Sequence, residues 1–149
     1  AKDTHVLVPI LPMSLMDVYG KKAKEFYSSR DPWFGDPVHK FAQAKAEPGW
    51  YLVRQTEVPG STSQNWDQQQ RLLGNGESVP SASVLAQTAL LHREQTGERL
   101  FSRVWVRSGD VTADGNRVDV SFDPGGLDVG RWGDGAYSYI GVAASRKSS

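Results

Sequence analysis

The sequence predicts a single α+β domain, and three observations lead to that prediction. Its 149 residues are enough for one domain with a substantial core, and no linker marks a second domain. Apolar residues have strand-like patterns near the N-terminus, helical spacing in the middle and strand-like alternation again in the C-terminal half. This separation of strands from helices favours an α+β fold over a doubly wound parallel sheet.

The N-terminal portion, residues 1–46, is expected to contain a strand and a helix. Residues 5–11 (HVLVPIL) have the apolar character of a strand, which Pro12 ends. Ser14 is placed to cap a helix whose apolar residues continue at helical spacing to Tyr27. The segment RDPWFGDP stops this helix, because proline disfavours a helical conformation in the residue before it.

The middle of the chain predicts one strand followed by two helices. The strand covers residues 50–58 (WYLVRQTEV). Ser61 and Gln64 fit a capping box, which predicts a helix through residues 65–73. The strongest helix covers about residues 81–95, because apolar residues form one wide face and Gly97 is placed to cap its end.

The C-terminal part predicts a hairpin followed by irregular structure. Residues 99–108 and 116–123 alternate as strands do, and turn-forming residues separate them. Residues 123–139 are expected to be mostly turns, and residues 140–147 to form a short terminal strand.

Composition argues against several classes of protein. The chain has no cysteine, which excludes disulfides, thiolate chemistry and cysteine-based zinc sites. Its 17 basic and 17 acidic residues give no electrostatic footprint for nucleic acid, and no apolar run is long enough to span a bilayer. The three histidines lack metal-ligand spacing, and no nucleophile elbow or phosphate-binding loop occurs. We therefore expect neither an enzyme nor a cofactor, and no nucleic-acid or membrane partner.

The run from Asp119 to Tyr139 has an unusual composition. It contains five glycines and four aspartates, but no lysine, glutamate, glutamine or methionine. Glycine, serine, aspartate and tyrosine in irregular loops are typical of a binding surface, since tyrosine gives contact area and the small residues give adaptable hydrogen bonding. An ordinary glycine-rich surface loop packed around Trp132 is the alternative interpretation.

Two kinds of position alternate in this run. Apolar positions are expected to anchor the segment in a core, and these scaffold residues are Phe122, Leu127, Val129, Trp132 and Ile140. The residues between them have no property in common except that each can lie on a protein surface. These candidate ligand-binding residues are Asp119, Ser121, Gly125, Asp128, Gly130, Arg131, Gly133, Gly135, Ala136, Tyr137, Ser138 and Tyr139. Tyr137 and Tyr139 are the expected affinity anchors, and Arg131 is the expected charged contact.

The segment NRVDVSFDPGGLDVGRWGDGAYSYIGVAASRK, within which residues 117–147 form the candidate variable region, resembles the variable region of proteins diversified by diversity-generating retroelements. It is most similar to the archaeal, viral and small-genome bacterial versions. The matching constant positions are Arg117, Val118, Val120, Phe122, Asp123, Gly126, Leu127, Val129, Trp132, Asp134, Ile140, Gly141, Ala143 and Arg146. Pro124 departs from the usual pattern, and residues 1–46 are not covered by the resemblance.

The resemblance implies a mechanism for the composition. In such systems an RNA template is copied with errors at adenines, and codons of the AAC or AAT type cannot become Lys, Glu, Gln, Met or Trp by changes at their first two bases. It also implies a C-type lectin fold, with two main helices and a small twisted antiparallel sheet. The implied partner is a variant-specific ligand, a protein or glycan on a cell or virus surface, and the site needs no metal.

Two further interpretations remain open from the sequence. Asp123, Asp128 and Asp134 could form a calcium-dependent or other carbohydrate-binding or carbohydrate-acting site, although the signatures of calcium lectins are missing. A structural module of a virion or cell-surface assembly would have the same scaffold without a diversified surface.

Overall fold

The structure of the chain is a computed structural model, which describes residues 4–27 and 30–148. Its main elements in chain order are β1 (His5–Ile10), α1 (Leu15–Lys22), β2 (Gly49–Arg54), α2 (Trp66–Gln70), α3 (Ala82–Thr96), β3 (Trp105–Val111), β4 (Arg117–Asp123), β5 (Gly126–Trp132), β6 (Ile140–Val142) and β7 (Ser145–Lys147). Short 3₁₀ helices lie at Ala23–Glu25, Trp33–Gly35 and Lys40–Gln43. The mixture of helices with largely antiparallel sheets confirms the α+β prediction.

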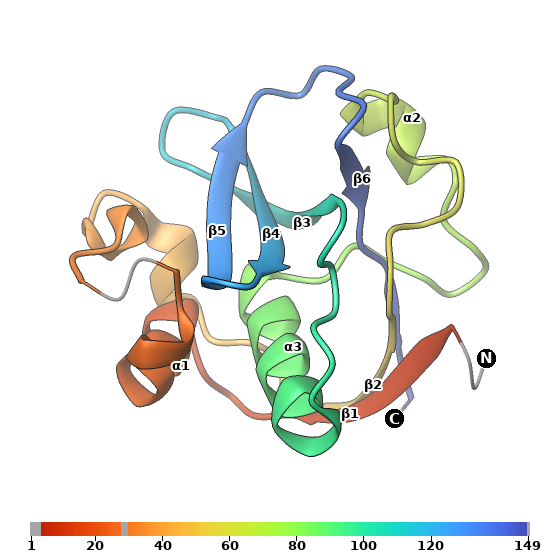
Figure 1. Ribbon diagram of the computed structural model, residues 1–149. Coiled ribbons are helices and arrows are strands. Elements are labelled where there is room, and N and C mark those ends of the chain that lie inside the picture. Colours follow the sequence, from red (N-terminus) through yellow and green to blue (C-terminus); the bar gives the residue numbers. More distant parts are fainter. Residues whose placement is uncertain (1–3, 28–29, 149) are drawn as a thin grey trace.

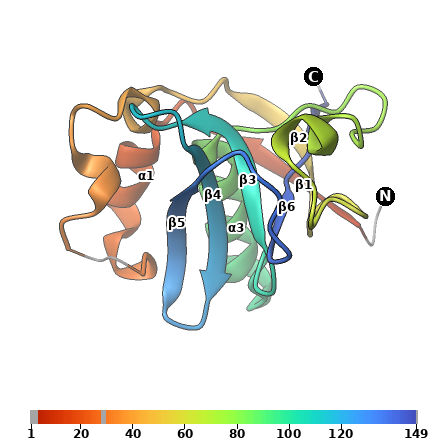
Figure 2. The same cartoon turned by 90° about the horizontal axis from the view of Figure 1, so that it is seen from above.

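The strands form two sheets on either side of α3 (Figure 1). One sheet has the antiparallel order β1-β2-β7, and the other has the order β5-β4-β3-β6 with a parallel β3–β6 pair. Helix α3 contacts β1 of the first sheet and β3, β4 and β5 of the second, and Figure 2 shows it beneath the second sheet. Two sheets with one parallel pair therefore replace the single antiparallel sheet that was expected.

The two longest helices begin where the sequence predicts. Ser14 caps α1 through a complete capping box, in which Ser14 Oγ accepts the Asp17 N–H at 3.0 Å and Asp17 Oδ2 accepts the Ser14 N–H at 2.9 Å. Ser81 caps α3, and Gly97 ends it with a φ of +81°, a conformation that favours glycine. Residues Ala82 to Leu90 are all buried, as expected for a helix between two sheets.

The predicted cap of α2 is wrong. The helix is capped by Asn65 and Gln68, whose side chains each accept the main-chain N–H of the other. Ser61 is fully buried instead, where its Oγ accepts the N–H of Val142 at 3.1 Å and its carbonyl accepts the Gln69 side chain at 2.9 Å. Two competing capping patterns lie close together in the sequence, and the long-range bonds of Ser61 to β6 and α2 select the second.

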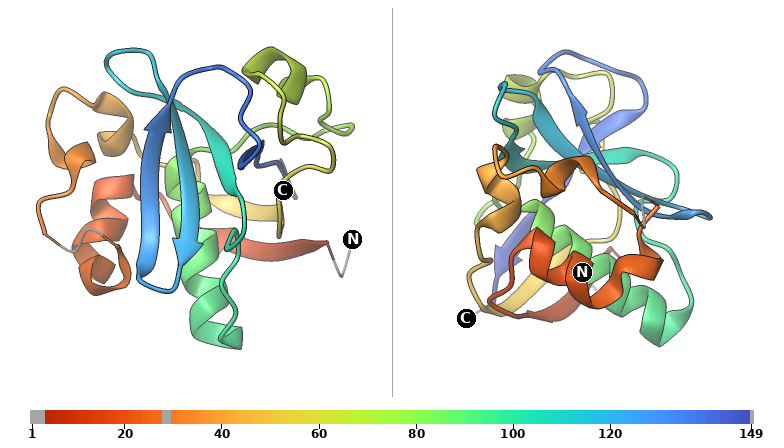
Figure 3. Two further views of the ribbon diagram at one scale, coloured as in Figure 1. Left: turned by 45° about the horizontal axis from the view of Figure 1, so that its top comes forward. Right: turned by 90° about the vertical axis from the view of Figure 1, so that its left-hand side faces the viewer.

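The C-terminal half contains more regular structure than expected. Residues 126–132 form β5, which pairs with β4 in an unbroken antiparallel register from Arg117–Trp132 to Asp123–Gly126. Strand β3 begins only at Trp105, because Phe101 has a left-handed backbone with φ +57° and residues 99–104 run as a loop. The terminal segment splits into β6 and β7, which belong to different sheets (Figure 3).

The N-terminal portion covers the free edge of β5. The Tyr27 N–H donates to the Leu127 carbonyl at 2.9 Å, and the Trp33 indole donates to the Val129 carbonyl at 2.8 Å. Gly126 permits this approach, because a Cβ atom there would lie 2.7 Å from the Phe26 carbonyl carbon. Unpaired sheet edges can pair with other strands, so Phe26, Tyr27 and Trp33 protect the edge of β5.

Candidate binding surface

The loop from Gly133 to Tyr139 joins β5 to β6 and is fixed by its main chain (Figure 1). Its carbonyls accept main-chain N–H groups from two other segments. Trp66 donates to Asp134 at 3.0 Å, Ser63 to Tyr137 at 2.9 Å, and Trp105 to Tyr139 at 3.0 Å. The donors lie at the start of α2 and β3, so the two elements hold the loop between them.

The Arg107 side chain also fixes this loop, at Gly133 and Gly135. This side chain is fully buried on β3. Its Nη2 donates to the carbonyls of Gly133 at 2.6 Å and Gly135 at 2.7 Å, and its Nη1 donates to Gln69 Oε1 at 2.9 Å. Burial lowers the pKa of this guanidinium, and the negative charge of Asp119 opposes that shift. Because these bonds reach carbonyls, they do not depend on which side chains the loop carries.

The side chains of the loop have room to change. Gly135, Ala136 and Ser138 are exposed, and neither Gly133 nor Gly135 has a positive φ. A Cβ atom on Gly133 or Gly135 would come no closer to the Tyr137 side chain than 3.5 or 3.8 Å, respectively. Other residues therefore fit at these positions without backbone strain.

Three aromatic side chains form one cluster on this surface. The ring centroids of Trp132, Tyr137 and Tyr139 lie 5.7–5.9 Å from one another. Trp132 is 38% exposed and Tyr139 is 43% exposed, whereas Tyr137 is partly buried over Arg107. The expectation that Trp132 anchors the core is therefore wrong, because it lies on the same outward face of β5 as Gly130. The other expected scaffold residues are buried: Phe122, Leu127, Val129 and Ile140.

Arg131 lies on the opposite face of β5 from Trp132 and is exposed. Its guanidinium stacks 4.4 Å above the ring of Trp33. The two side chains border an open hollow of about 480 Å³ that Asp36 and His39 also line. The N-terminal portion thus contributes to the surface beside β5.

Two of the predicted surface residues are buried. Asp119 is 0% exposed and Ser121 is 7% exposed, and Ser121 Oγ donates to the Phe101 carbonyl at 3.2 Å. Neither oxygen of the Asp119 carboxyl has a hydrogen-bond partner in the described part of the chain. Burial raises the pKa of Asp119 to about 8, so the carboxyl is mainly neutral at pH 7. The outward face of β4 is covered, and these two side chains cannot reach a ligand directly.

Gly130 fits closely against its neighbours. A Cβ atom there would lie 2.5 Å from Asp119 Oδ1 and 2.9 Å from Trp105 Cζ3. Asp119 pairs with Gly130 across the sheet, so its carboxyl occupies the space that a side chain at position 130 would need. These two positions are therefore coupled by packing.

Gly125 and Asp128 lie toward the hairpin end of β5. Gly125 is exposed, but a Cβ atom there would lie 3.0 Å from the Tyr27 ring. Asp128 is partly buried, and its pKa is raised mainly by that burial and further by the charge of Asp123. Both residues therefore lie at the edge of the candidate surface, away from the aromatic cluster.

The three aspartates of the carbohydrate interpretation are not brought together. Asp123 pairs with Gly126 at one end of the β4–β5 hairpin, whereas Asp134 follows the other end and forms an ion pair with Arg117 at 3.2 Å. In residues 4–27 and 30–148, no group of three or more His, Cys, Asp or Glu residues could hold a metal ion. The same described residues include no helix long and apolar enough to cross a membrane.

Sequence reasoning missed the residues that fix the loop. Ser63, Trp66 and Gln69 come from one segment at α2 and Arg107 comes from β3, and no motif in the sequence indicates that these two segments hold the same loop. Comparison with known proteins adds no residue to the site, because no family model, curated protein or solved structure matches this chain. The interpretation therefore depends on the geometry of the surface.

Proposed function

We propose that the chain is a ligand-binding protein that presents a diversified surface on a constant C-type lectin-like scaffold. One observation carries this proposal: groups outside the loop bind the main-chain carbonyls of Gly133, Asp134, Gly135, Tyr137 and Tyr139. A loop fixed in this way keeps its shape while its side chains change. That property is what a surface with variant-specific ligands requires.

The proposed contact surface consists of the exposed side chains of the loop and the end of β5. Tyr137 and Tyr139 supply rigid contact area, Ser138 supplies adaptable hydrogen bonding, and Arg131 supplies a charged contact at the margin. In this proposal Trp132 is part of the contact surface instead of a core scaffold residue. A tryptophan codon contains no adenine, so Trp132 is a constant aromatic anchor in the centre of a surface that otherwise varies.

The α+β architecture supports the scaffold part of the proposal. Helices α1 and α3 are the two longest, and the strands are mostly antiparallel, as the resemblance implies. The proposed ligand is a protein or glycan on a cell or virus surface, and its binding requires neither catalysis nor a cofactor.

The proposal is tested by sequencing the 3′ part of this gene, with its flanking DNA, across many individuals of its source population. We expect changes concentrated at adenine-containing codons between residues 119 and 139, with Trp132 unchanged, next to a near-identical non-coding copy. At positions 119 and 130 we expect restricted, coupled variation, because the two residues share one space. Uniform codons without a second copy would contradict a diversified site.

A further inference from the structure

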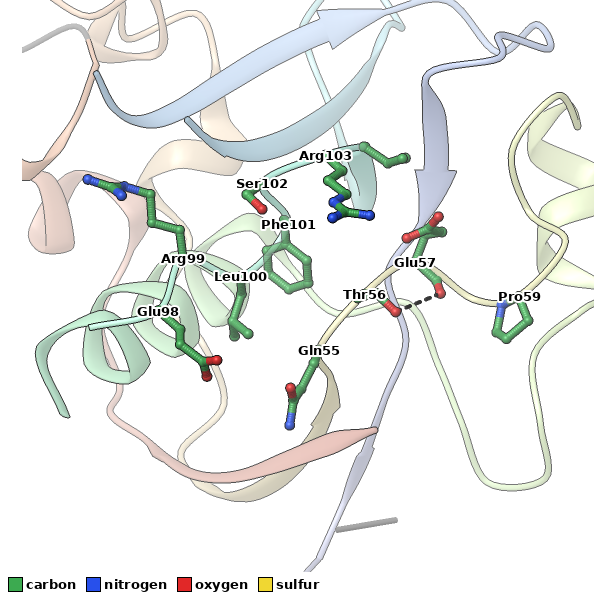
Figure 4. A pocket seen from close by; sticks show the side chains of 11 residues that line it. Gln55, Thr56, Glu57, Pro59, Glu98, Arg99, Leu100, Phe101, Ser102 and Arg103 are labelled. Atoms are coloured by element: carbon green, nitrogen blue, oxygen red, sulfur yellow. Dashed lines mark hydrogen bonds between the residues drawn. The ribbon is translucent and has the colours of Figure 1, made fainter. Parts of the chain in front are cut away.

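A second hollow lies beside the proposed contact surface and outside the candidate variable region. Its volume is about 500 Å³, and its walls come from two segments, residues 55–59 after β2 and residues 98–104 before β3 (Figure 4). The loop residue Tyr139 is close to it, since the Trp105 N–H that follows the second wall donates to the Tyr139 carbonyl at 3.0 Å. All the lining residues precede position 117, so diversification of residues 117–147 leaves the walls unchanged.

Among the four charged residues that line the hollow, one acid and one base are free to bind a ligand. Glu98 contacts His92 at 3.1 Å, and the guanidinium of Arg99 lies over the Phe122 ring at 5.9 Å and points away from the hollow (Figure 4). Glu57 and Arg103 have no side-chain hydrogen bond or ion pair with the described residues. Each projects from a different wall, and the two do not form an ion pair with each other, so the hollow presents an unpaired carboxylate and an unpaired guanidinium.

Both walls are held in place by bonds to the sheet. The segment that carries Glu57 is tied to β6 by the Val58 N–H, which donates to the Val142 carbonyl at 2.9 Å. On the other wall the Phe101 carbonyl accepts the Phe122 N–H at 3.0 Å and the hydroxyl of Ser121 at 3.2 Å. These bonds hold Phe101 in a left-handed backbone conformation, which is costly for an aromatic residue and is characteristic of functional sites.

We propose that this hollow binds a small zwitterionic group of the amino-acid or unblocked-dipeptide class. Its ammonium group pairs with Glu57, its carboxylate pairs with Arg103, and its apolar part lies against the Phe101 ring. A guanidinium suits a carboxylate because it can donate two parallel hydrogen bonds. A ligand with only one charge would leave the opposite wall charge without a partner, so both ends of the zwitterion contribute.

The hollow adds a constant element to the proposed function. A diversified surface recognises the feature that differs between ligands, whereas a hollow with constant walls recognises a feature that all of them share. This role as a common anchor rests on the proposed function, but binding of the zwitterion itself does not.

The probe is the dipeptide alanyl-alanine, titrated into the full chain and followed by calorimetry. We expect saturable, millimolar binding that is at least tenfold weaker for N-acetyl-alanyl-alanine, which lacks the ammonium, and for alanyl-alanine amide, which lacks the carboxylate. Glu57→Gln and Arg103→Gln should each weaken binding by a similar factor. Arg99→Gln is the matched control, because its guanidinium faces away from the hollow, and this variant should bind normally.

Equal binding of the blocked and unblocked dipeptides, no saturable binding at millimolar concentration, or an equal loss in Arg99→Gln would each overturn the proposal. A Tyr137→Ala/Tyr139→Ala double variant separates this site from the proposed function. It should retain dipeptide binding even though it alters the aromatic surface. Uniform codons in the gene would remove the common-anchor role and leave this binding result unaffected.

Discussion

Replacing Arg107 with methionine is expected to destabilise the protein by about 3 kcal/mol and to release the loop from Gly133 to Tyr139. The substitution removes the donors to the carbonyls of Gly133 and Gly135 and to the side chain of Gln69. These acceptors then remain in a partly or fully buried environment without a partner, which is the costly part of the change. Methionine keeps most of the side-chain volume, so loss of packing contributes little.

Denaturant unfolding measures the change in stability, and limited proteolysis measures release of the loop. Arg131→Met is the matched control, because Arg131 is exposed and its guanidinium stacks on Trp33 instead of binding the carbonyls of the loop. We expect that control to change the free energy of unfolding by less than about 1 kcal/mol and to leave the loop resistant. An equal effect of the two variants would show that Arg107 does not fix the loop.

Replacing Asp119 with asparagine is expected to remove a large pH dependence of stability. In the folded chain burial raises the pKa of Asp119 from 3.8 to about 8, so the folded state holds a proton that the unfolded state releases. Stability therefore falls as pH rises between these two values, by about 1.4 kcal/mol for each pH unit. Among the charges facing Asp119, Arg107 on β3 favours ionisation and Asp128 on β5 opposes it. Asparagine has a similar shape and no proton to lose.

Denaturant unfolding from pH 4 to pH 8 tests this effect. The wild-type free energy of unfolding should decline across the range relative to that of Asp119→Asn, and the difference should grow with pH. Asp134→Asn serves as the control, since Asp134 is exposed and paired with Arg117, and it should follow the wild type. Parallel curves for the wild type and Asp119→Asn would show that Asp119 is ionised at little cost in the folded chain.

Local sequence patterns predicted the elements whose ends are fixed by neighbouring residues. Ser14 and Ser81 cap α1 and α3 as expected, and Gly97 ends α3. Ser61 shows where this reasoning fails, because its pattern fits a cap but its hydrogen bonds run to β6 and α2. Strand β5 was missed for a related reason, since its glycine and aspartate content resembles a loop although its pairing with β4 is regular.

The sequence predicts only some of the exposed residues of the candidate site, because a local pattern does not show what packs over it. Alternation along β4 correctly separates the two faces of the strand, but it does not reveal what covers each face. Asp119 and Ser121 lie on the other face of β4 from its buried valines, yet both are buried, and the Ser121 hydroxyl donates to the Phe101 carbonyl of the loop before β3. The role of Arg107 could not be predicted from the sequence. A single arginine in a strand belongs to no pattern that shows that its guanidinium binds the distant carbonyls of Gly133 and Gly135.

The central claim is that the surface tolerates substitution because the loop is held through its main-chain carbonyls and not through its side chains, and two display libraries test it most directly. One library randomises the exposed positions Arg131, Gly135, Ala136, Ser138 and Tyr139, and the other randomises the buried positions Asp119 and Ser121 together with the closely packed position Gly130. The measurement is the fraction of each library that stays folded, read as resistance to protease. We predict that most members of the first library remain folded and most members of the second do not. Equal loss of folding in both libraries would contradict the claim.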